Sequence, residues 1–244
     1  MFLEDPPRTQ FDLNFSVLGI PVRVHPLFWL TSLVLGLANP EPGQLMIWVG
    51  VVFVSVLVHE LGHALVAQRF GFRPWITLYS FGGLASYQSS RSKPGEQIAI
   101  LLAGPGAGFL LAALVWALLE LSGGAVYFQW TRVGRGTLLS QTNPQLALLV
   151  EDLLYVNIFW GIINLFPVYP LDGGQISRTL FMKYNPWQGL RQSIFLSVLT
   201  GAALAAYALL VKKPADFYLA FMFGYLAYLS YASLQGPWGR LGRW

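Results

Sequence analysis

Cysteine is absent from this 244-residue chain, and charged residues are scarce. Without cysteine there can be no disulfide, no thiolate zinc site and no thiol redox chemistry. Any metal site must use Asp, Glu or one of only three histidines, His25, His59 and His63. Charged residues make up 11% of the chain, against about 25% in a typical soluble domain. With 55% hydrophobic residues, the composition argues against a soluble domain and for a membrane protein.

Long apolar runs account for most of the chain. About 20 consecutive apolar residues, each rising 1.5 Å in a helix, cross the hydrocarbon core of a bilayer. We therefore expect an all-α polytopic membrane protein with about six transmembrane helices, at 24–38, 45–69, 96–120, 146–168, 190–211 and 216–235. The longest stretch between spans, about 121–145, is too short for a globular insert. Residues 1–244 are thus expected to form a single membrane-embedded domain with no appended soluble domain.

Lys and Arg are unevenly divided between the loops. If the N-terminus is cytoplasmic, eleven of the 15 basic residues face the cytoplasm, and the four on the other side are Arg132, Arg135, Lys212 and Lys213. The positive-inside rule then predicts that both termini are cytoplasmic, as an even number of spans requires. We expect a multi-pass protein of the plasma (inner) membrane in contact with the lipid bilayer. Because the basic residues lie in short loops, nucleic acid is not an expected partner.

One segment, 72–90, interrupts the helical pattern with aromatic, β-branched and glycine residues. Residues 75–81, Gly82-Gly83 and residues 84–87 predict a short membrane-associated β-hairpin between the second and third spans. An open strand edge cannot face lipid, so this hairpin must lie at the interface, pack on protein or line a wet cavity.

The string His59-Glu60-Leu61-Gly62-His63 lies within an apolar run. Residues four apart share one face of a helix, so both imidazoles can bind one zinc ion. Glu60 can then reach a water molecule on the metal. Ionisable residues inside a membrane helix are expensive and mark function by default. The alternative is a polar contact between helices, made by neutral histidines.

A catalytic zinc ion needs a third protein ligand. The candidates are His25 and eleven carboxylates, of which Asp172 stands out because it follows the proline-containing string NLFPVYPL at 164–171. Prolines disrupt the helix there, and irregular backbone at membrane depth is tolerated where it lines a polar cavity. An ordinary Asp-Gly turn fits the string equally well. The predicted orientation places Asp172 and the histidine pair at comparable depth on the cytoplasmic side.

Together the two motifs resemble those of the site-2 protease family of intramembrane zinc metalloproteases, peptidase family M50. Residues 59–63 match its HExxH motif, and residues 164–174 match its NxxPxxPxDGG motif. Phe81-Gly82-Gly83 and Ala103-Gly104-Pro105 extend the resemblance, which covers roughly residues 20–185. These residues would be the catalytic core, followed by a C-terminal helical pair at about 190–235. One departure is Gly108, where the family often has Asn.

The resemblance implies a role for each residue of the motifs. One zinc ion would be held by His59, His63 and Asp172, with Glu60 as the acid/base, and Asn164 would contact the substrate or the developing oxyanion. The implied activity is hydrolysis of peptide bonds in single-pass transmembrane proteins, that is, regulated intramembrane proteolysis. His25 matches a frequent first-span histidine, but an interfacial residue before proline explains it equally well, so we leave it out of the metal set.

The predicted hairpin suggests how a substrate is held. A transmembrane substrate is helical and must unwind before attack, and a strand edge could hold the extended segment by β-augmentation. Gly82 and Gly83 are therefore predicted to contact the substrate. Two other functions stay open: a metal-handling membrane transporter, which would keep the ligands without needing Glu60, and a catalytically silent membrane scaffold.

Overall fold

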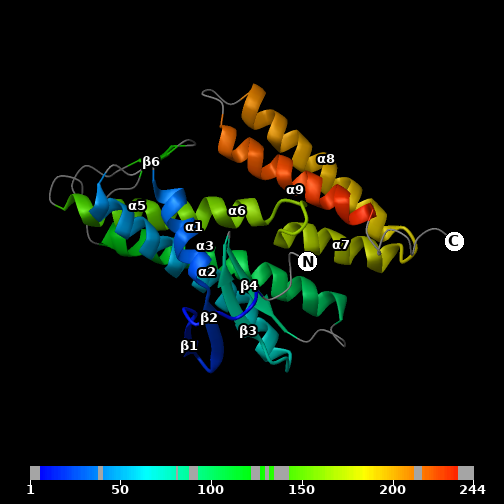
Figure 1. The fold of residues 1–244 in the computed structure, drawn as a ribbon, viewed down its shortest axis with the longest axis horizontal. Coiled ribbons are helices and arrows are strands. Elements are labelled where there is room, and N and C mark those ends of the chain that lie inside the picture. Colours follow the sequence, from blue (N-terminus) through cyan, green and yellow to red (C-terminus); the bar gives the residue numbers. More distant parts are fainter. Residues whose placement is uncertain are drawn as a thin grey trace. The chain divides into compact units, whose positions relative to one another are not determined.

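The computed structural model describes residues 6–37, 41–80, 82–87, 93–121, 127–129, 132–134, 143–211 and 216–235. Most of them are helical (Figure 1). The chain forms two compact units, one of Met1–Arg91 with Leu102–Gly161 and one of Ser92–Leu101 with Ile162–Trp244.

Four helical segments are long and apolar enough to cross a membrane. They are α2 (Pro42–Arg69), α3 (Pro94–Leu121), the run Pro144–Asn164 and α8 (Gly189–Leu210). The run consists of α5 (Pro144–Tyr155), the π-helical turn η1 (Val156–Trp160) and α6 (Gly161–Asn164). The other two predicted spans are also helical, as the 11-residue α1 (Pro26–Gly36) and the 19-residue α9 (Phe217–Gln235). Six crossings remain a prediction.

The first unit contains a sheet of four strands in the order β1-β2-β3-β4. The predicted hairpin is present as β3 (Trp75–Tyr79) and β4 (Gly82–Ser86), which pair antiparallel. Its place in the membrane remains a prediction. The expectation of an all-α protein with a lone hairpin needs correction, because β1 (Leu13–Val17) and β2 (Ile20–Val24) form a second hairpin, and β2 pairs parallel with β3.

The β1–β2 hairpin forms because its sequence alternates and its turn has the required backbone shape. Ile20, Val22 and Val24 alternate with more exposed residues and are buried. Leu18 and Gly19 both have positive φ, at 52° and 79°, which suits the tight turn of a two-residue hairpin. The buried face of β2 joins Phe28 of α1, together with residues of α2 and β3, in the core of this unit.

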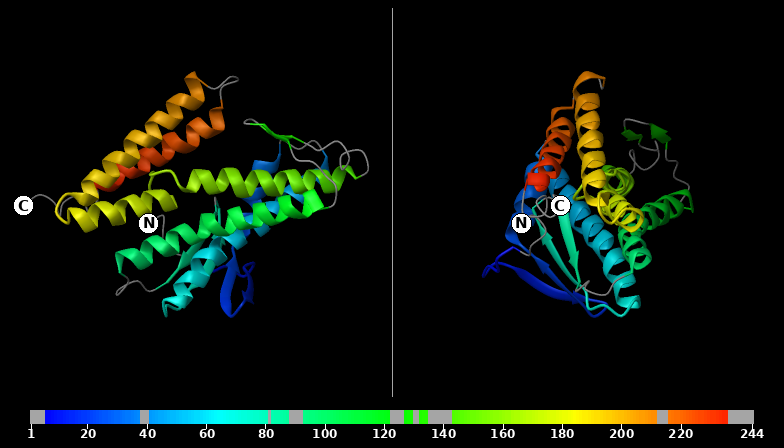
Figure 2. Two further views of the ribbon diagram at one scale, coloured as in Figure 1. Left: turned by 180° about the vertical axis from the view of Figure 1, so that it is seen from behind. Right: turned by 90° about the vertical axis from the view of Figure 1, so that its right-hand side faces the viewer.

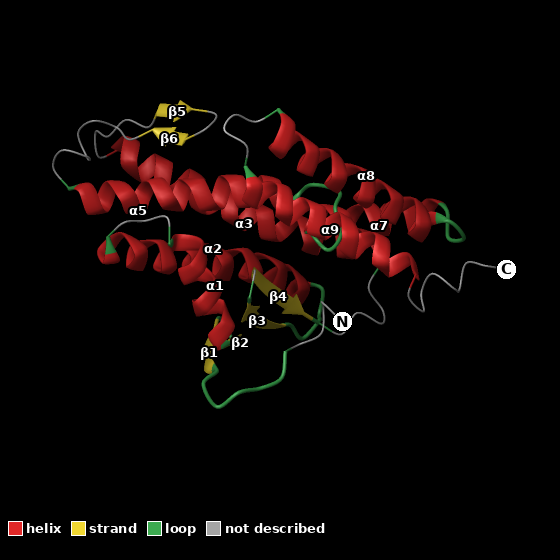
Figure 3. Cartoon of the chain, turned by 45° about the horizontal axis from the view of Figure 1, so that its top comes forward, coloured by secondary structure: helices red, strands yellow, loops and turns green. Residues whose placement is uncertain are grey.

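The sheet lies against α2, which carries the HExxH motif (Figure 3). Val56 and Ala64, which bracket the motif on α2, pack in one core with Ile76 and Leu78 of β3. Burial of this apolar surface fixes the sheet on the helix. One side of the helix that carries the motif is therefore covered by strands.

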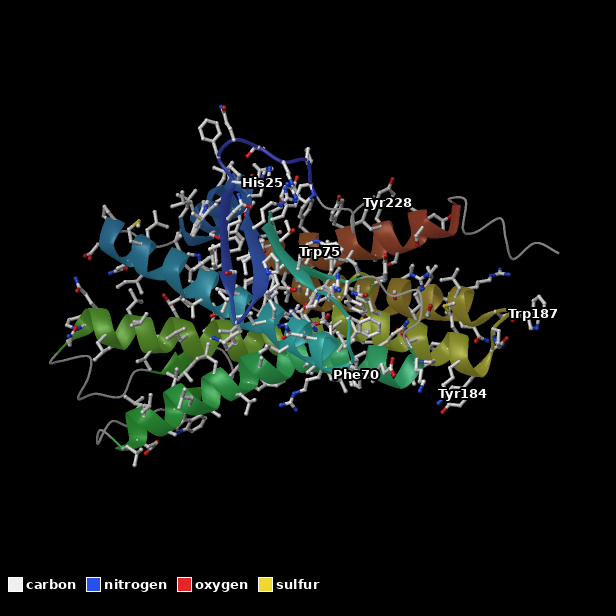
Figure 4. All side chains as sticks on the ribbon, turned by 90° about the horizontal axis from the view of Figure 1, so that it is seen from below. His25, Phe70, Trp75, Tyr184, Trp187 and Tyr228 are labelled. Atoms are coloured by element: carbon white, nitrogen blue, oxygen red, sulfur yellow. The ribbon has the colours of Figure 1, made fainter. Side chains whose placement is uncertain are left out.

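The second unit contains α7 (Asp172–Tyr184) and the C-terminal helices α8 and α9, which run side by side in both views of Figure 2. A Cβ atom added at Gly201 of α8 would lie 3.0 Å from the Cβ atom of Ala227 on α9. Small residues at such a crossing let two helices approach closely, as is common in membrane proteins. Tyr184 at the end of α7 and Trp187 after it are exposed and point outward (Figure 4).

Some predictions fall on residues outside the described ranges. These residues are Phe81, Arg91, Arg135, Lys212, Lys213, Arg240 and Arg243. The charge asymmetry between the loops, and with it the orientation of the chain, therefore stays a prediction.

Candidate metal centre

The two histidines of α2 are placed to share an ion. His59 and His63 are both buried, and their Nε2 atoms lie 3.1 Å apart. Their rings meet at 84°, so the nitrogens converge without the rings stacking. Two nitrogens bound to one tetrahedral zinc ion at about 2.0–2.1 Å are about 3.3 Å apart. One turn of α2 thus provides a pair of nitrogens with the spacing that a zinc ion needs.

Glu60 is buried beside them, and the backbone of β4 covers it. A Cβ atom added at Gly83 would lie 2.6 Å from both the carboxyl carbon and Oε1 of Glu60. Glycine is thus the residue that lets β4 approach this carboxyl group. Gly82, its neighbour, has nothing within 4 Å of an added Cβ. Of the two predicted substrate-contact glycines, Gly83 is the one that lies next to Glu60.

Helix α3 approaches α2 equally closely. A Cβ atom added at Gly62 would lie 2.8 Å from the Cβ atom of Ala107, and it would come still closer to the carbonyl oxygen of Ala103. A Cβ atom at Gly104 would lie 2.8 Å from Cδ2 of His63 and closer to two other ring atoms. The Ala103-Gly104-Pro105 string therefore has a local purpose: its glycine makes room for a predicted metal ligand.

A buried amide that bonds to Ser55, one turn before the motif, was missed by sequence reasoning. Asn157 of η1 donates from Nδ2 to Oγ of Ser55 at 2.9 Å, and to the carbonyl of Leu153 at 2.8 Å. Ser55 precedes His59 by four residues and lies on the same face of α2. The available signal was an amide within an apolar run, where polar side chains commonly hydrogen-bond between helices. A π-helical turn such as η1 is itself frequent at functional sites.

Asp172 begins α7, and Gly173 and Gly174 let the preceding loop fold onto that helix. Added Cβ atoms would lie 2.6 Å from the carbonyl oxygen of Phe166 at Gly173 and 2.6 Å from that of Val168 at Gly174. Asp172 itself is buried, and a carboxylate in a helix's first turn is stabilised by the helix dipole. Close packing of loop on helix therefore fixes the backbone that carries this carboxylate.

Several main-chain groups of the loop between α6 and α7 are paired within the loop or with α7. The N–H of Val168 donates to the carbonyl of Phe166 at 2.7 Å, and the N–H of Leu171 to that of Val168 at 2.9 Å. The side chain of Gln175 on α7 donates to the carbonyl of Pro170 at 3.0 Å. Irregular backbone within a membrane protein requires such pairing. These bonds close short turns and fix the internal shape of the loop.

His59 and His63 of the first unit and Asp172 of the second are each buried. Two imidazoles and one carboxylate are a donor set of catalytic zinc sites, which keep a further position for water or substrate.

His25 already has another role: its Nδ1 accepts from the N–H of Leu27 at 3.1 Å and caps α1. Its ring also meets that of Tyr79 on β3 edge-on, with 4.9 Å between the ring centroids. Asn164 is buried at the end of α6.

Comparison with known proteins gives the chain a family. Residues 47–206 match peptidase family M50. The chain is 30% identical over 189 residues to stage IV sporulation protein FB of Bacillus subtilis, covering 75% of this chain and 57% of that protein. It is 30% identical over 200 residues to a zinc metalloprotease of Methanocaldococcus jannaschii, covering 80% and 52%. The chain thus spans about half the length of these curated relatives.

The fold has a solved counterpart. A site-2 protease from Methanocaldococcus jannaschii matches with a TM-score of 0.59 at 22% identity, over 90% of this chain and 95% of that one. The four membrane-length apolar helices and this shared fold describe an integral membrane protein. The family predicted from the HExxH and NxxPxxPxDGG motifs is confirmed, and the chain belongs to peptidase family M50.

Proposed function

We propose that this protein is a zinc-dependent intramembrane endopeptidase of the site-2 protease type, which hydrolyses peptide bonds of transmembrane proteins. The observation that carries the proposal is the buried pair of Nε2 atoms 3.1 Å apart on an apolar helix, with Glu60 between them in sequence. Membership of a peptidase family, and the names of the relatives from Methanocaldococcus jannaschii, support it.

In this proposal His59, His63 and Asp172 hold one zinc ion. Their burial and donor chemistry fit the ion, because neutral imidazoles and a carboxylate are ligands that zinc accepts. When bound, zinc supplies a lowered pKa for a coordinated water molecule and a Lewis acid for a carbonyl group. The chain's other residues must then move protons and place the substrate.

Glu60 is the proposed proton carrier. It accepts a proton from the attacking water and later passes it to the nitrogen of the leaving amine. The backbone of β4 at Gly83 limits where its carboxyl group can lie. Asn164 is the proposed donor to the substrate carbonyl oxygen as negative charge develops there. Its side-chain amide carries two N–H donors, which suits that task.

The sheet offers a place for the unwound substrate. β4 is the last strand in the order β1-β2-β3-β4, and its residue Gly83 lies against Glu60. An extended segment added alongside β4 would pair with main-chain groups near Gly82 and Gly83. Such a segment would pass close to the proposed base. Single-pass membrane proteins are the proposed substrates.

We further propose that this module crosses the membrane six times with both termini cytoplasmic, in the plasma membrane. The support is the excess of basic residues in the loops assigned to the cytoplasm. Under this topology the two motifs lie toward the same side, and water enters the site from the cytoplasm.

Proteomics on membranes with the wild type, Glu60→Gln and Asp172→Asn, combined with zinc measurement on the purified proteins, tests the function. We expect single-pass proteins to accumulate uncut with either variant. Glu60→Gln should retain zinc, whereas Asp172→Asn should lose it. Unchanged membrane proteins with Glu60→Gln, together with retained metal flux in vesicles, would instead support a metal transporter.

A further inference from the structure

Three serines are completely enclosed in the C-terminal helices. Ser193 and Ser197 of α8 and Ser230 of α9 are 2%, 1% and 0% exposed. A serine in an apolar helix commonly donates to a carbonyl one turn back in its own helix. Ser193 does this, donating to Leu190 at 2.8 Å, and so does Ser197, donating to Ser193 at 3.0 Å. Ser230 differs, because its hydroxyl donates outside its helix.

Ser197 and Ser230 meet on the main chain of one residue, Tyr169. The hydroxyl of Ser230 donates to the carbonyl of Tyr169 at 3.0 Å. The N–H of Tyr169 donates to Oγ of Ser197 at 3.1 Å. Hydroxyls from two helices thus pair with both polar main-chain groups of Tyr169. Ser230 lies 61 residues after Tyr169 in the sequence, and Ser197 lies 28 residues after it.

Tyr169 lies in the loop before α7, three residues ahead of Asp172. The guanidinium group of Arg178 on α7 lies over its ring, with Cζ 5.9 Å from the ring centroid, in a cation–π contact. Its main chain packs against Gly174, where an added Cβ atom would fall within 2.5 Å of the carbonyl carbon of Val168. Tyr169 is therefore held at its N–H, at its C=O and at its ring.

The hydrogen bonds of Tyr169 with Ser197 and Ser230 have a different effect from the hydrogen bonds within the loop. The bonds of Val168 and Leu171 close short turns and fix the internal shape of the loop. The bonds to Ser197 and Ser230 tie that shape to α8 and α9, and the ring of Phe166 adds an apolar contact with Phe223 of α9. Because α8 and α9 are themselves in close contact at Gly201, the two hydroxyls share a firm support.

We propose that Ser197 and Ser230 are positioning residues that hold the Asp172 carboxylate where zinc requires it. The C-terminal helical pair is then part of the metal centre's support, through one clamped residue of the loop. This inference rests on the proposed role of Asp172 as a zinc ligand. Residues that orient a metal ligand typically change metal affinity or activity 10–100-fold when removed.

The test uses the 244-residue chain in detergent. The double variant Ser197→Ala/Ser230→Ala is compared with the wild type, and Ser193→Ala is the matched control. Ser193 lies on α8, is equally enclosed, and bonds within its own helix. We measure zinc affinity by chelator competition and the visible absorption of the cobalt-substituted protein, which reports ligand geometry. The double variant should bind zinc about tenfold more weakly and shift the cobalt bands. The control should change neither.

Two further variants separate the possible failures. Ser230→Thr keeps the hydroxyl donor and adds a methyl group, so it should retain more zinc affinity than Ser230→Ala if the hydrogen bond matters rather than packing. Asp172→Asn is measured alongside. If Asp172→Asn binds zinc as tightly as the wild type does, Asp172 is not a zinc ligand. The proposed positioning role of Ser197 and Ser230 then fails as well. If Asp172→Asn loses zinc, but the double variant has the same zinc affinity and cobalt spectrum as Ser193→Ala, only the positioning role of Ser197 and Ser230 is overturned.

Discussion

Replacing Gly104 with alanine tests whether α3 shapes the metal site. The new Cβ atom would lie 2.8 Å from Cδ2 of His63 and closer still to two other ring atoms. Ordinary carbon contacts are about 3.5–4.0 Å, so the ring must retreat by roughly 1 Å or the helices must separate. Separation is costly because Gly62 and Ala107 already meet at this crossing. Overpacking of this kind costs about 1–3 kcal/mol.

The same displacement should weaken the metal site. The Nε2 atoms of His59 and His63 now lie 3.1 Å apart, and metal–ligand distances tolerate changes of only about 0.2 Å. We expect Gly104→Ala to lower zinc affinity at least tenfold in chelator competition, and to lower the thermal midpoint of the apo-protein. Gly106→Ala is the control on the same helix, since nothing lies within 4 Å of its added Cβ. It should be neutral or, through helix propensity, stabilising by up to about 1 kcal/mol.

Equal zinc affinity and equal unfolding midpoints for the two variants would refute this reasoning. That result would mean that α3 moves freely away from α2, so that the close approach at Gly104 does not constrain the ligand. A lower midpoint with unchanged affinity would be as damaging to the functional claim, because it would make the contact one of packing alone.

Three further substitutions have defined outcomes. Gly83→Ala should push the proposed base aside by roughly 1 Å and slow single-turnover cleavage in proteoliposomes about 100-fold while zinc content stays unchanged; zinc loss would contradict this. Asn157→Leu should leave Ser55 without its amide partner and lower the free energy of unfolding by about 1–3 kcal/mol in denaturant titration; an unchanged midpoint would count against the buried bond. Gly201→Val should lower the thermal midpoint, whereas Gly224→Ala, whose added Cβ has its nearest neighbour at 4.0 Å, should not.

Much of the fold could be predicted because its signals are local. Four long apolar runs predicted α2, α3, the run Pro144–Asn164 and α8, and β-branched residues around two glycines predicted β3 and β4. The β1–β2 hairpin escaped because Ile20–Val24 runs directly into the apolar residues of α1. Its turn residues, Leu18 and Gly19, also lack the usual Asn-Gly signature.

The side-chain partners of the site were harder to predict than its ligands. The HExxH and NxxPxxPxDGG strings carry spacing and chemistry that a sequence displays directly. Asn157 and Ser55 meet across 102 residues, and Ser230 meets Tyr169 across 61. A serine or asparagine in an apolar helix has the same appearance in sequence whether it bonds to its own helix or to another. Only the fold distinguishes the two cases.

The glycines around the site share one physical reason. Polar groups inside a membrane protein must be kept from lipid, and backbone without a side chain can enclose them more closely than any side chain can. The effect of an alanine substitution at each glycine then depends on which atoms the added methyl group would meet. At Gly173 it meets the carbonyl of Phe166, which cannot move without unfolding the loop, so alanine there should prevent folding. At Gly104 it meets the imidazole ring of His63 and should weaken zinc binding. At Gly83 it meets the flexible side chain of Glu60, which can rotate away, so only turnover should suffer.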